Sequence, residues 1–166
     1  MIVLYMLSRC EVPLSKSGIY DFILEKEYTT FLTLQEVFAE LVSSGLVIEK
    51  TWGNRTYLEI TDEGRQTLEF FGNRINPSIR QEIDEFLKEN SMQLRNEAAI
   101  LGDYTKTAEN EYTVRLKAME GGRNLLDISL EVPTEEMALK MLENWKINNQ
   151  KIYSDLFLYL TEDEGN

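Results

Sequence analysis

Apolar residues recur at helical spacing in three stretches of the first 45 residues. Residues 2–10 form the first stretch, and Pro13 and Gly18 interrupt the chain around the start of a second, which begins at Ser17. The third stretch ends at Ser44-Gly45, where glycine permits a left-handed stop, and its apolar face consists of Leu34, Val37, Phe38, Leu41 and Val42. The pattern predicts three helices, with the short polar joint 27–30 between the second and the third.

A change of period after Gly45 predicts a β-hairpin. Residues 46–51 and 56–60 are rich in strand-forming side chains, and the turn-forming segment 52–55 separates them. Thr61 then begins a further helix that closes at Gly72-Asn73. Three helices, a hairpin and a helix form the order of a winged helix-turn-helix followed by its linker helix.

The second half of the chain has a different pattern. A long amphipathic helix is predicted from Pro77 to about Leu101. Alternating apolar residues at 112–118 and 126–132 predict two antiparallel strands around Gly121-Gly122, and a short strand at 103–107 pairs with the first. A last helix follows Pro133 and continues through Leu160.

These elements predict an α+β protein of two domains. Residues 1–75 form a winged helix-turn-helix domain, and residues 76–166 form an α-β-β-β-α domain for dimerisation or sensing. The acidic run at 162–164 is expected to fray at the end of the last helix.

Composition argues against catalysis and against a membrane location. The chain has no histidine and one cysteine, so we expect no disulfide, no metal, no cofactor and no enzymatic activity. Cys10 lies in an apolar stretch and is interpreted as a small core residue. No apolar run approaches the ~18 residues of a membrane span, and residues 1–7 lack the basic flank and cleavage site of a signal peptide. A cytoplasmic location is expected.

The net charge of −12 has the wrong sign for general adhesion to nucleic acid. Any contact with DNA must therefore be made by a local group of residues.

Several segments resemble an uncharacterised bacterial family, the domain-of-unknown-function family 4364. The segments are Val12–Ser15, Phe22–Glu25 with Tyr28, Leu41–Leu46, Leu126-Asp127 and Glu143–Lys146. The resemblance covers nearly the whole chain and implies a winged-helix transcriptional regulator without catalytic residues. Because family members carry a few residues before the first helix, it also implies a truncated or alternative start. The segment Leu58–Arg65 is, in addition, similar to the strand-to-helix corner of bacterial winged-helix repressors.

A winged helix that reads DNA places its third helix in the major groove. The candidate contacts there are the polar residues Thr29, Thr30, Thr33, Gln35 and Glu36. No arginine or lysine is available on this helix to read guanine. In the alternative interpretation, Thr30 caps the helix and the other residues form a solvated face.

The hairpin supplies the candidate contacts to phosphate. These are Lys50, Trp52, Asn54 and Arg55, with Lys16 as a further contact near the second helix. Trp52 either wedges against DNA or packs on the strands of its own hairpin.

The last helix has more apolar positions than one small sheet can cover. The predicted dimer interface consists of Trp145, Ile152, Tyr153, Leu156, Phe157 and Leu160. The alternative is that this helix only crosses its own sheet and packs on the helix at 77–101.

The combined prediction is a homodimeric regulator that binds double-stranded DNA at a palindromic operator. The alternative is a winged-helix protein-interaction module that does not bind DNA, favoured by the net charge and by the third helix without arginine or lysine. A small-molecule effector between the sheet and helices of the second half is compatible with either.

Overall fold

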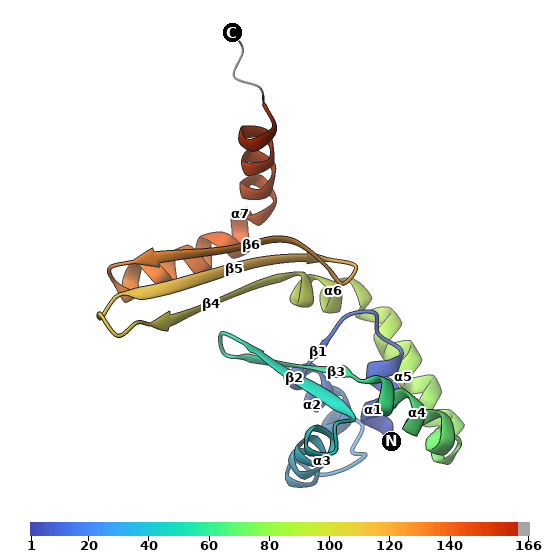
Figure 1. Cartoon of the computed structure of the whole chain (residues 1–166). Coiled ribbons are helices and arrows are strands. Elements are labelled where there is room, and N and C mark those ends of the chain that lie inside the picture. Colours follow the sequence, from blue (N-terminus) through green and yellow to red (C-terminus); the bar gives the residue numbers. More distant parts are fainter. Residues whose placement is uncertain (163–166) are drawn as a thin grey trace. The chain divides into compact units, whose positions relative to one another are not determined.

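The computed structural model describes residues 1–162 and divides into two compact units, Met1–Ala98 and Ala99–Asn166 (Figure 1). Helices and sheets are both present, which places the protein in the α+β class. Glu162 follows the last helix, whereas Asp163 and Glu164 of the predicted frayed run lie outside the described residues.

The first unit contains helices around one small sheet. Its elements are α1 (Ile2–Ser8), β1 (Leu14–Ser15), α2 (Lys16–Glu25), α3 (Phe31–Ser43), β2 (Val47–Trp52), β3 (Arg55–Ile60), α4 (Asp62–Phe71), the 3-10 helix η1 (Gly72–Arg74), α5 (Pro77–Glu89) and α6 (Ser91–Ala99). Three helices begin at a hydroxyl side chain that accepts a hydrogen bond from a backbone amide three residues later. These caps are Ser15, Thr30 and Thr61.

The sheet of the first unit has the strand order β1-β3-β2, and both pairs are antiparallel. The predicted hairpin is confirmed, with Val47 opposite Ile60 and Trp52 opposite Arg55. Gly53 lies in the turn at a φ of 60°, a conformation that glycine adopts at little cost. The strand β1 was not predicted because two residues are too short to show alternation.

The core of the first unit extends further along the chain than the predicted domain boundary at residue 75. Phe22, Phe38 and Leu58 are almost fully buried, and Ile83 of α5 and Leu94 of α6 belong to the same cluster. Helices α5 and α6 are therefore part of the first unit, and the boundary between the two units in the sequence follows Ala98.

The predicted single helix at 77–101 is two helices, which is a correction. Asn90 is the C-cap of helix α5, and its backbone amide and side-chain amide both donate to the carbonyl oxygen of Phe86, over 3.0 Å and 2.8 Å. The chain then turns into α6 and, from Ile100, into a strand instead of helix.

The second unit is one antiparallel sheet with one long helix. Its elements are β4 (Ile100–Lys106), β5 (Tyr112–Glu120), β6 (Arg123–Val132) and α7 (Glu135–Thr161), with the strand order β4-β5-β6. The two alternating strands and their pairing around Gly121-Gly122 are confirmed. The strand predicted at 103–107 also exists and begins earlier, at Ile100.

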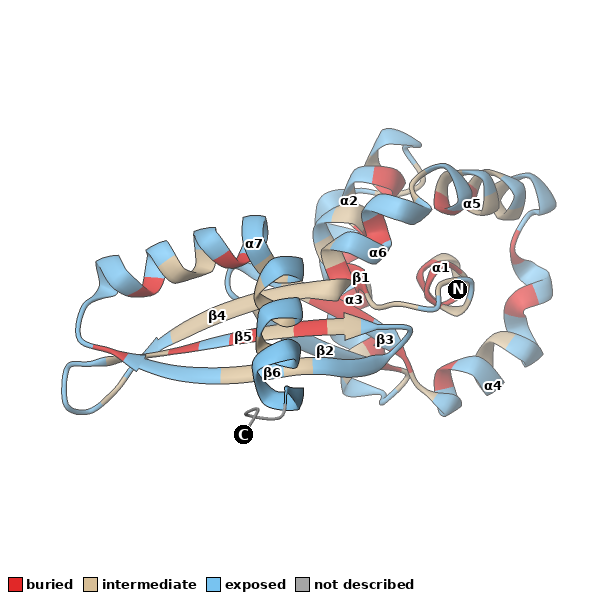
Figure 2. Ribbon diagram, turned by 90° about the horizontal axis from the view of Figure 1, so that it is seen from above, coloured by how far each residue is buried: buried red, intermediate tan, exposed pale blue. Residues whose placement is uncertain are grey.

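The core of the second unit lies between the central strand and the first half of α7. Val114, Leu116 and Ala118 are buried on β5, as the red segments of Figure 2 show. Trp145 of α7 is 1% exposed, and its Nε1 donates to the carbonyl oxygen of Leu101 over 3.0 Å.

Gly64 in α4 belongs to the strand-to-helix corner Leu58–Arg65, and its surroundings require a glycine. A methyl group at this position would overlap the backbone carbonyl oxygen of Leu46, and it would also crowd the side chain of Ile60. Since backbone cannot move aside as a flexible side chain does, α4 approaches the start of the hairpin only with glycine here.

Gly64→Ala is therefore expected to lower the free energy of unfolding by about 1–3 kcal/mol, because the helix must shift away from the hairpin. Urea unfolding followed by circular dichroism measures this loss. Gly72→Ala is the control, since its φ is −61° and a methyl group there meets only the Leu68 side chain at 3.4 Å. Equal stability of the two variants would contradict the proposed close approach.

Candidate nucleic-acid interface

Helix α3 presents a polar face to solvent at its first turns. Thr30, Thr33, Gln35 and Glu36 are exposed, whereas Thr29 is half-buried in the joint before the helix. Thr30 caps α3, because its hydroxyl accepts from the Thr33 amide over 3.3 Å and lies 3.0 Å from the Thr33 hydroxyl. The capping interpretation of Thr30 is thus observed, and contact of these side chains with DNA bases stays a prediction.

Two apolar side chains also lie on the exposed part of α3. Phe31 is 48% exposed and Leu32 is 71% exposed. The ring of Tyr20 stacks on Phe31 with 4.9 Å between centroids, so this aromatic ring is held in place. Neither residue was among the candidates from the sequence. Phe31 continues the helical spacing of Leu34 and Phe38, which favours a core position, whereas Leu32 lies outside that spacing.

Each predicted cationic contact has a carboxylate partner within the first unit. Lys16 pairs with Glu49 at 2.5 Å, and Lys50 pairs with Glu59 at 3.3 Å. Arg55 pairs with Glu97 at 3.6 Å. The three cations are therefore locally neutralised, which the sequence did not indicate because the pairs join residues from different elements.

The other two hairpin residues differ in exposure. Trp52 is half-buried at the end of β2, and Asn54 is exposed in the turn. Their predicted contacts with DNA are not tested by this arrangement.

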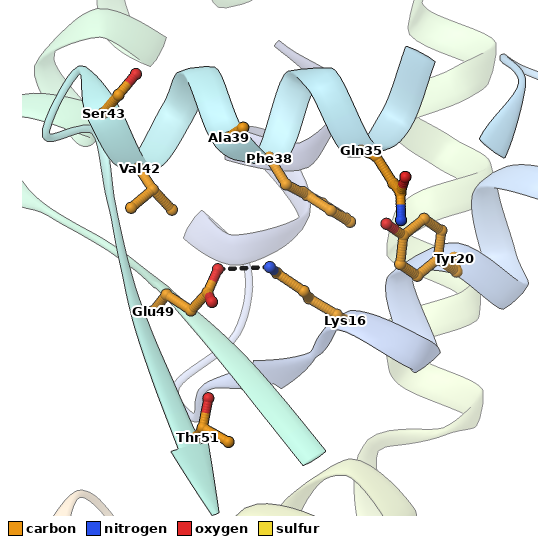
Figure 3. A pocket seen from close by; sticks show the side chains of 9 residues that line it. All are labelled: Lys16, Tyr20, Gln35, Phe38, Ala39, Val42, Ser43, Glu49 and Thr51. Atoms are coloured by element: carbon orange, nitrogen blue, oxygen red, sulfur yellow. Dashed lines mark ion pairs between the residues drawn. The ribbon is translucent and has the colours of Figure 1, made fainter. Parts of the chain in front are cut away.

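A pocket of about 510 Å³ lies between α2, α3 and β2 (Figure 3). The Lys16–Glu49 ion pair spans it, and the Lys16 ammonium lies 5.6 Å from the centre of the Phe38 ring. Gln35 lies at its edge, so the pocket brings together two of the predicted contacts, Lys16 and Gln35.

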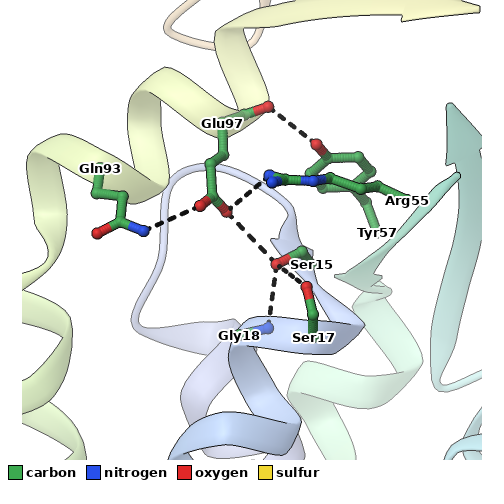
Figure 4. Close-up of polar contacts among 7 residues, drawn as sticks. All are labelled: Ser15, Ser17, Gly18, Arg55, Tyr57, Gln93 and Glu97. Carbon is green, nitrogen blue, oxygen red and sulfur yellow. Dashed lines mark hydrogen bonds and ion pairs between the residues drawn. The ribbon is translucent and has the colours of Figure 1, made fainter. Parts of the chain in front are cut away.

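A second cluster joins β3, near the turn of the hairpin, to α6 (Figure 4). Glu97 accepts from Gln93 over 3.1 Å and from the Ser15 hydroxyl over 3.5 Å, in addition to its pair with Arg55. Its backbone oxygen accepts from the Tyr57 hydroxyl over 3.0 Å. Glu97 was missed because a single glutamate in a helix carries no signal in the sequence.

The predicted dimer residues of α7 fall into two groups. Trp145 is buried within its own unit, and Ile152 packs against the same core. Trp145 therefore has no surface to offer a partner, which corrects its placement in the interface. The other four lie in the C-terminal part of α7, the red segment that extends away from the sheet in Figure 1; Tyr153 and Leu156 are half-buried, and Phe157 and Leu160 are exposed.

Burial raises the pKa of the Cys10 thiol to about 11, so this thiol stays protonated at neutral pH. Cys10 is half-buried and packs against the core of the first unit without being part of it. Within residues 1–162, no three histidine, cysteine, aspartate or glutamate side chains are grouped to hold a metal ion. Over the same range, no helix is long and apolar enough to cross a membrane.

The two units and the exposed face of α3 define an α+β protein with one candidate binding surface in its first unit. The family model described as "domain of unknown function (DUF4364)" matches residues 1–160, and the chain belongs to this family. Comparisons with curated proteins and with solved structures gave no match.

A hydrogen-bonded carboxylate fixes the joint before α3. Glu82 of α5 accepts from the Tyr28 hydroxyl over 2.8 Å and pairs with Lys26 at 3.3 Å. The Tyr28 hydroxyl and then the Lys26 ammonium lower the pKa of Glu82 below its ordinary value. The stabilisation is therefore complete above the ordinary pKa of glutamate and is lost as the pH falls through the lower value of the folded protein.

Glu82→Gln is expected to lower the melting temperature at neutral pH, and the difference from the unmodified protein should vanish in acid as Glu82 becomes protonated. Thermal unfolding between neutral pH and pH values below the ordinary pKa of glutamate measures this convergence. Glu85→Gln is the matched control, since Glu85 accepts only from Gln81 of its own helix. A difference that stays constant with pH would refute the role assigned to the Glu82 carboxylate.

Proposed function

We propose that this protein is a homodimeric transcriptional regulator that binds double-stranded DNA through a winged helix-turn-helix in its first unit. The observation that carries the proposal is the arrangement of α3. This helix follows α2 after a short joint, exposes polar side chains over its first turns, and is followed by the β2–β3 hairpin. That order is typical of a recognition helix and its wing.

In this proposal, α3 enters the major groove with Thr33, Gln35 and Glu36 towards the bases. The wing residues Lys50 and Arg55 and the α2 residue Lys16 contact phosphate. The carboxylate partner of Lys50 does not prevent this, because the two side chains of that pair are 58% and 48% exposed and exposed ion pairs stabilise a protein by only about 0–1 kcal/mol. Such a regulator acts in the cytoplasm, where bacterial DNA lies.

The C-terminal part of α7 supports the homodimer. Tyr153, Leu156, Phe157 and Leu160 share one stripe of the helix, and Phe157 and Leu160 are 57% and 78% exposed. A stripe of large apolar side chains on a helix that extends beyond its own sheet is suited to the same stripe of a second copy. A two-fold dimer would match a palindromic operator.

The wing is tested by the double variant Lys50→Ala/Arg55→Ala. We expect weaker binding to a fluorescein-labelled duplex of mixed sequence, and a salt dependence whose slope falls by about 0.9 to 1.8, because each lost phosphate contact removes about 0.9 and Arg55 is paired with Glu97 in the unmodified protein. Fluorescence anisotropy at several salt concentrations measures both. Lys140→Ala/Lys146→Ala, which removes two exposed charges from α7, is the control. Unchanged affinity and slope in the wing variant would remove the wing from the proposal.

The dimer is tested by Leu160→Asp, which places a charge in the exposed apolar stripe. We expect the mass in solution, measured by light scattering, to fall from that of a dimer towards that of a monomer, since a charge buried at an interface without a partner is costly. Ser154→Asp adds the same charge outside the stripe and should leave the dimer intact. A mass unaffected by Leu160→Asp would exclude this stripe as the interface.

A second function, a winged-helix module that binds another protein, is favoured by a specific observation. Phe31 and Leu32 expose apolar surface on the helix that would read DNA, and α3 carries Glu36 and Glu40 but no lysine or arginine. The anisotropy titration separates the two functions. Binding of a few genomic fragments at physiological salt supports the regulator, whereas no binding even at low salt supports the protein-interaction module.

A further inference from the structure

Glu97 is the point where three separate parts of the first unit meet. Its carboxylate contacts Arg55 at the start of β3 and Ser15 at the start of α2, while its backbone oxygen accepts from Tyr57. Figure 4 shows the Arg55 guanidinium and the Ser15 hydroxyl directed to the same carboxylate oxygen of Glu97. Along the chain, Arg55, Ser15 and Tyr57 lie 42, 82 and 40 residues before Glu97.

Glu97, the partner of Arg55, is more buried and has more hydrogen-bonded neighbours than Glu59, the partner of Lys50. The Glu97 side chain is 22% exposed, and its neighbours Ser15 and Tyr57 are 3% and 6% exposed. In the Lys50–Glu59 pair, by contrast, the side chains are 58% and 48% exposed and both belong to the hairpin. A carboxylate already ordered by its neighbours loses less conformational freedom when it binds a cation.

We propose that Glu97 is an autoinhibitory latch, which holds the Arg55 guanidinium of the hairpin in place of a nucleic-acid phosphate. Carboxylate and phosphate compete for a guanidinium because both supply charged oxygens that accept its N–H groups. In the latched state, Arg55 does not contribute its full charge to the binding surface. The inference rests on the proposed DNA-binding function and adds a means of regulating it.

The position of Glu97 in the chain indicates how the latch is released. Helix α6 ends at Ala99 and β4 begins at Ile100, so no linker separates the latch helix from the first strand of the second unit. A rearrangement of β4 therefore acts on α6 through the covalent chain. Withdrawal of Glu97 would free Arg55, Ser15 and Tyr57 together.

The experiment compares four proteins: the unmodified chain, Glu97→Gln, Arg55→Ala and the double variant. Each is titrated by fluorescence anisotropy into a fluorescein-labelled duplex of mixed sequence at several salt concentrations. We expect Glu97→Gln to bind about three- to tenfold more tightly at low salt, with a slope steeper by about 0.9, as for one additional phosphate contact. This gain should disappear in the double variant, because it depends on Arg55.

Two controls separate release of Arg55 from other effects. Glu69→Gln removes the same charge from an exposed position of α4 and should give a smaller gain that persists when Arg55 is also replaced by alanine. Gln93→Ala removes a hydrogen bond to Glu97 while leaving its carboxylate, so it should leave the slope unchanged. Circular dichroism confirms that each variant is folded.

The outcomes distinguish the latch from the proposed function. Binding by the unmodified protein with no gain in Glu97→Gln, or a gain that survives in the double variant, overturns the latch alone. Absence of binding by all four proteins at low salt overturns the proposed function and the latch with it.

Discussion

The antiparallel pairing of β3 is the constraint on which the first unit depends. This strand lies between β1 and β2, and Leu58 at its centre is fully buried. The neighbour β1 ends at Ser15, which caps the start of α2. The neighbour β2 follows α3 and forms the hairpin with β3. On the same strand, Tyr57 donates to α6. A slip of one residue in β3 would move Leu58 out of the core and separate all three parts.

Charge is organised in pairs across this framework. The chain has a net charge of −12, and yet Lys16, Lys50 and Arg55 are each placed beside a carboxylate from another strand or helix. For the proposed regulator, such pairs would reduce the attraction of nucleic acid in general and leave the cations to a ligand that outcompetes the carboxylates. Selectivity of that regulator would then depend on geometry more than on net charge.

Elements set by local patterns could be predicted from the sequence, and those set by tertiary contacts could not. The hairpin at 46–60 and the cap at Thr61 follow from neighbouring residues. The break at Asn90 interrupts a continuous amphipathic pattern, and β1 exists only because β3 pairs with it. At the candidate site, the exposed polar positions of α3 were identifiable, whereas the role of Glu97 depends on contacts with residues far away in sequence.

The direct passage from α6 into β4 limits how the two units can influence one another. A flexible linker would allow the second unit to self-associate without consequence for the hairpin, because its conformational freedom would absorb the motion. Here a helix ends at Ala99 and a strand begins at Ile100, so the backbone at this point has few alternative conformations. Glu97 lies two residues before the end of α6, so the proposed latch is close to this junction along the chain. In the proposed homodimeric regulator, a change in the backbone of β4 has this short covalent path to Glu97, and no separate hinge is required.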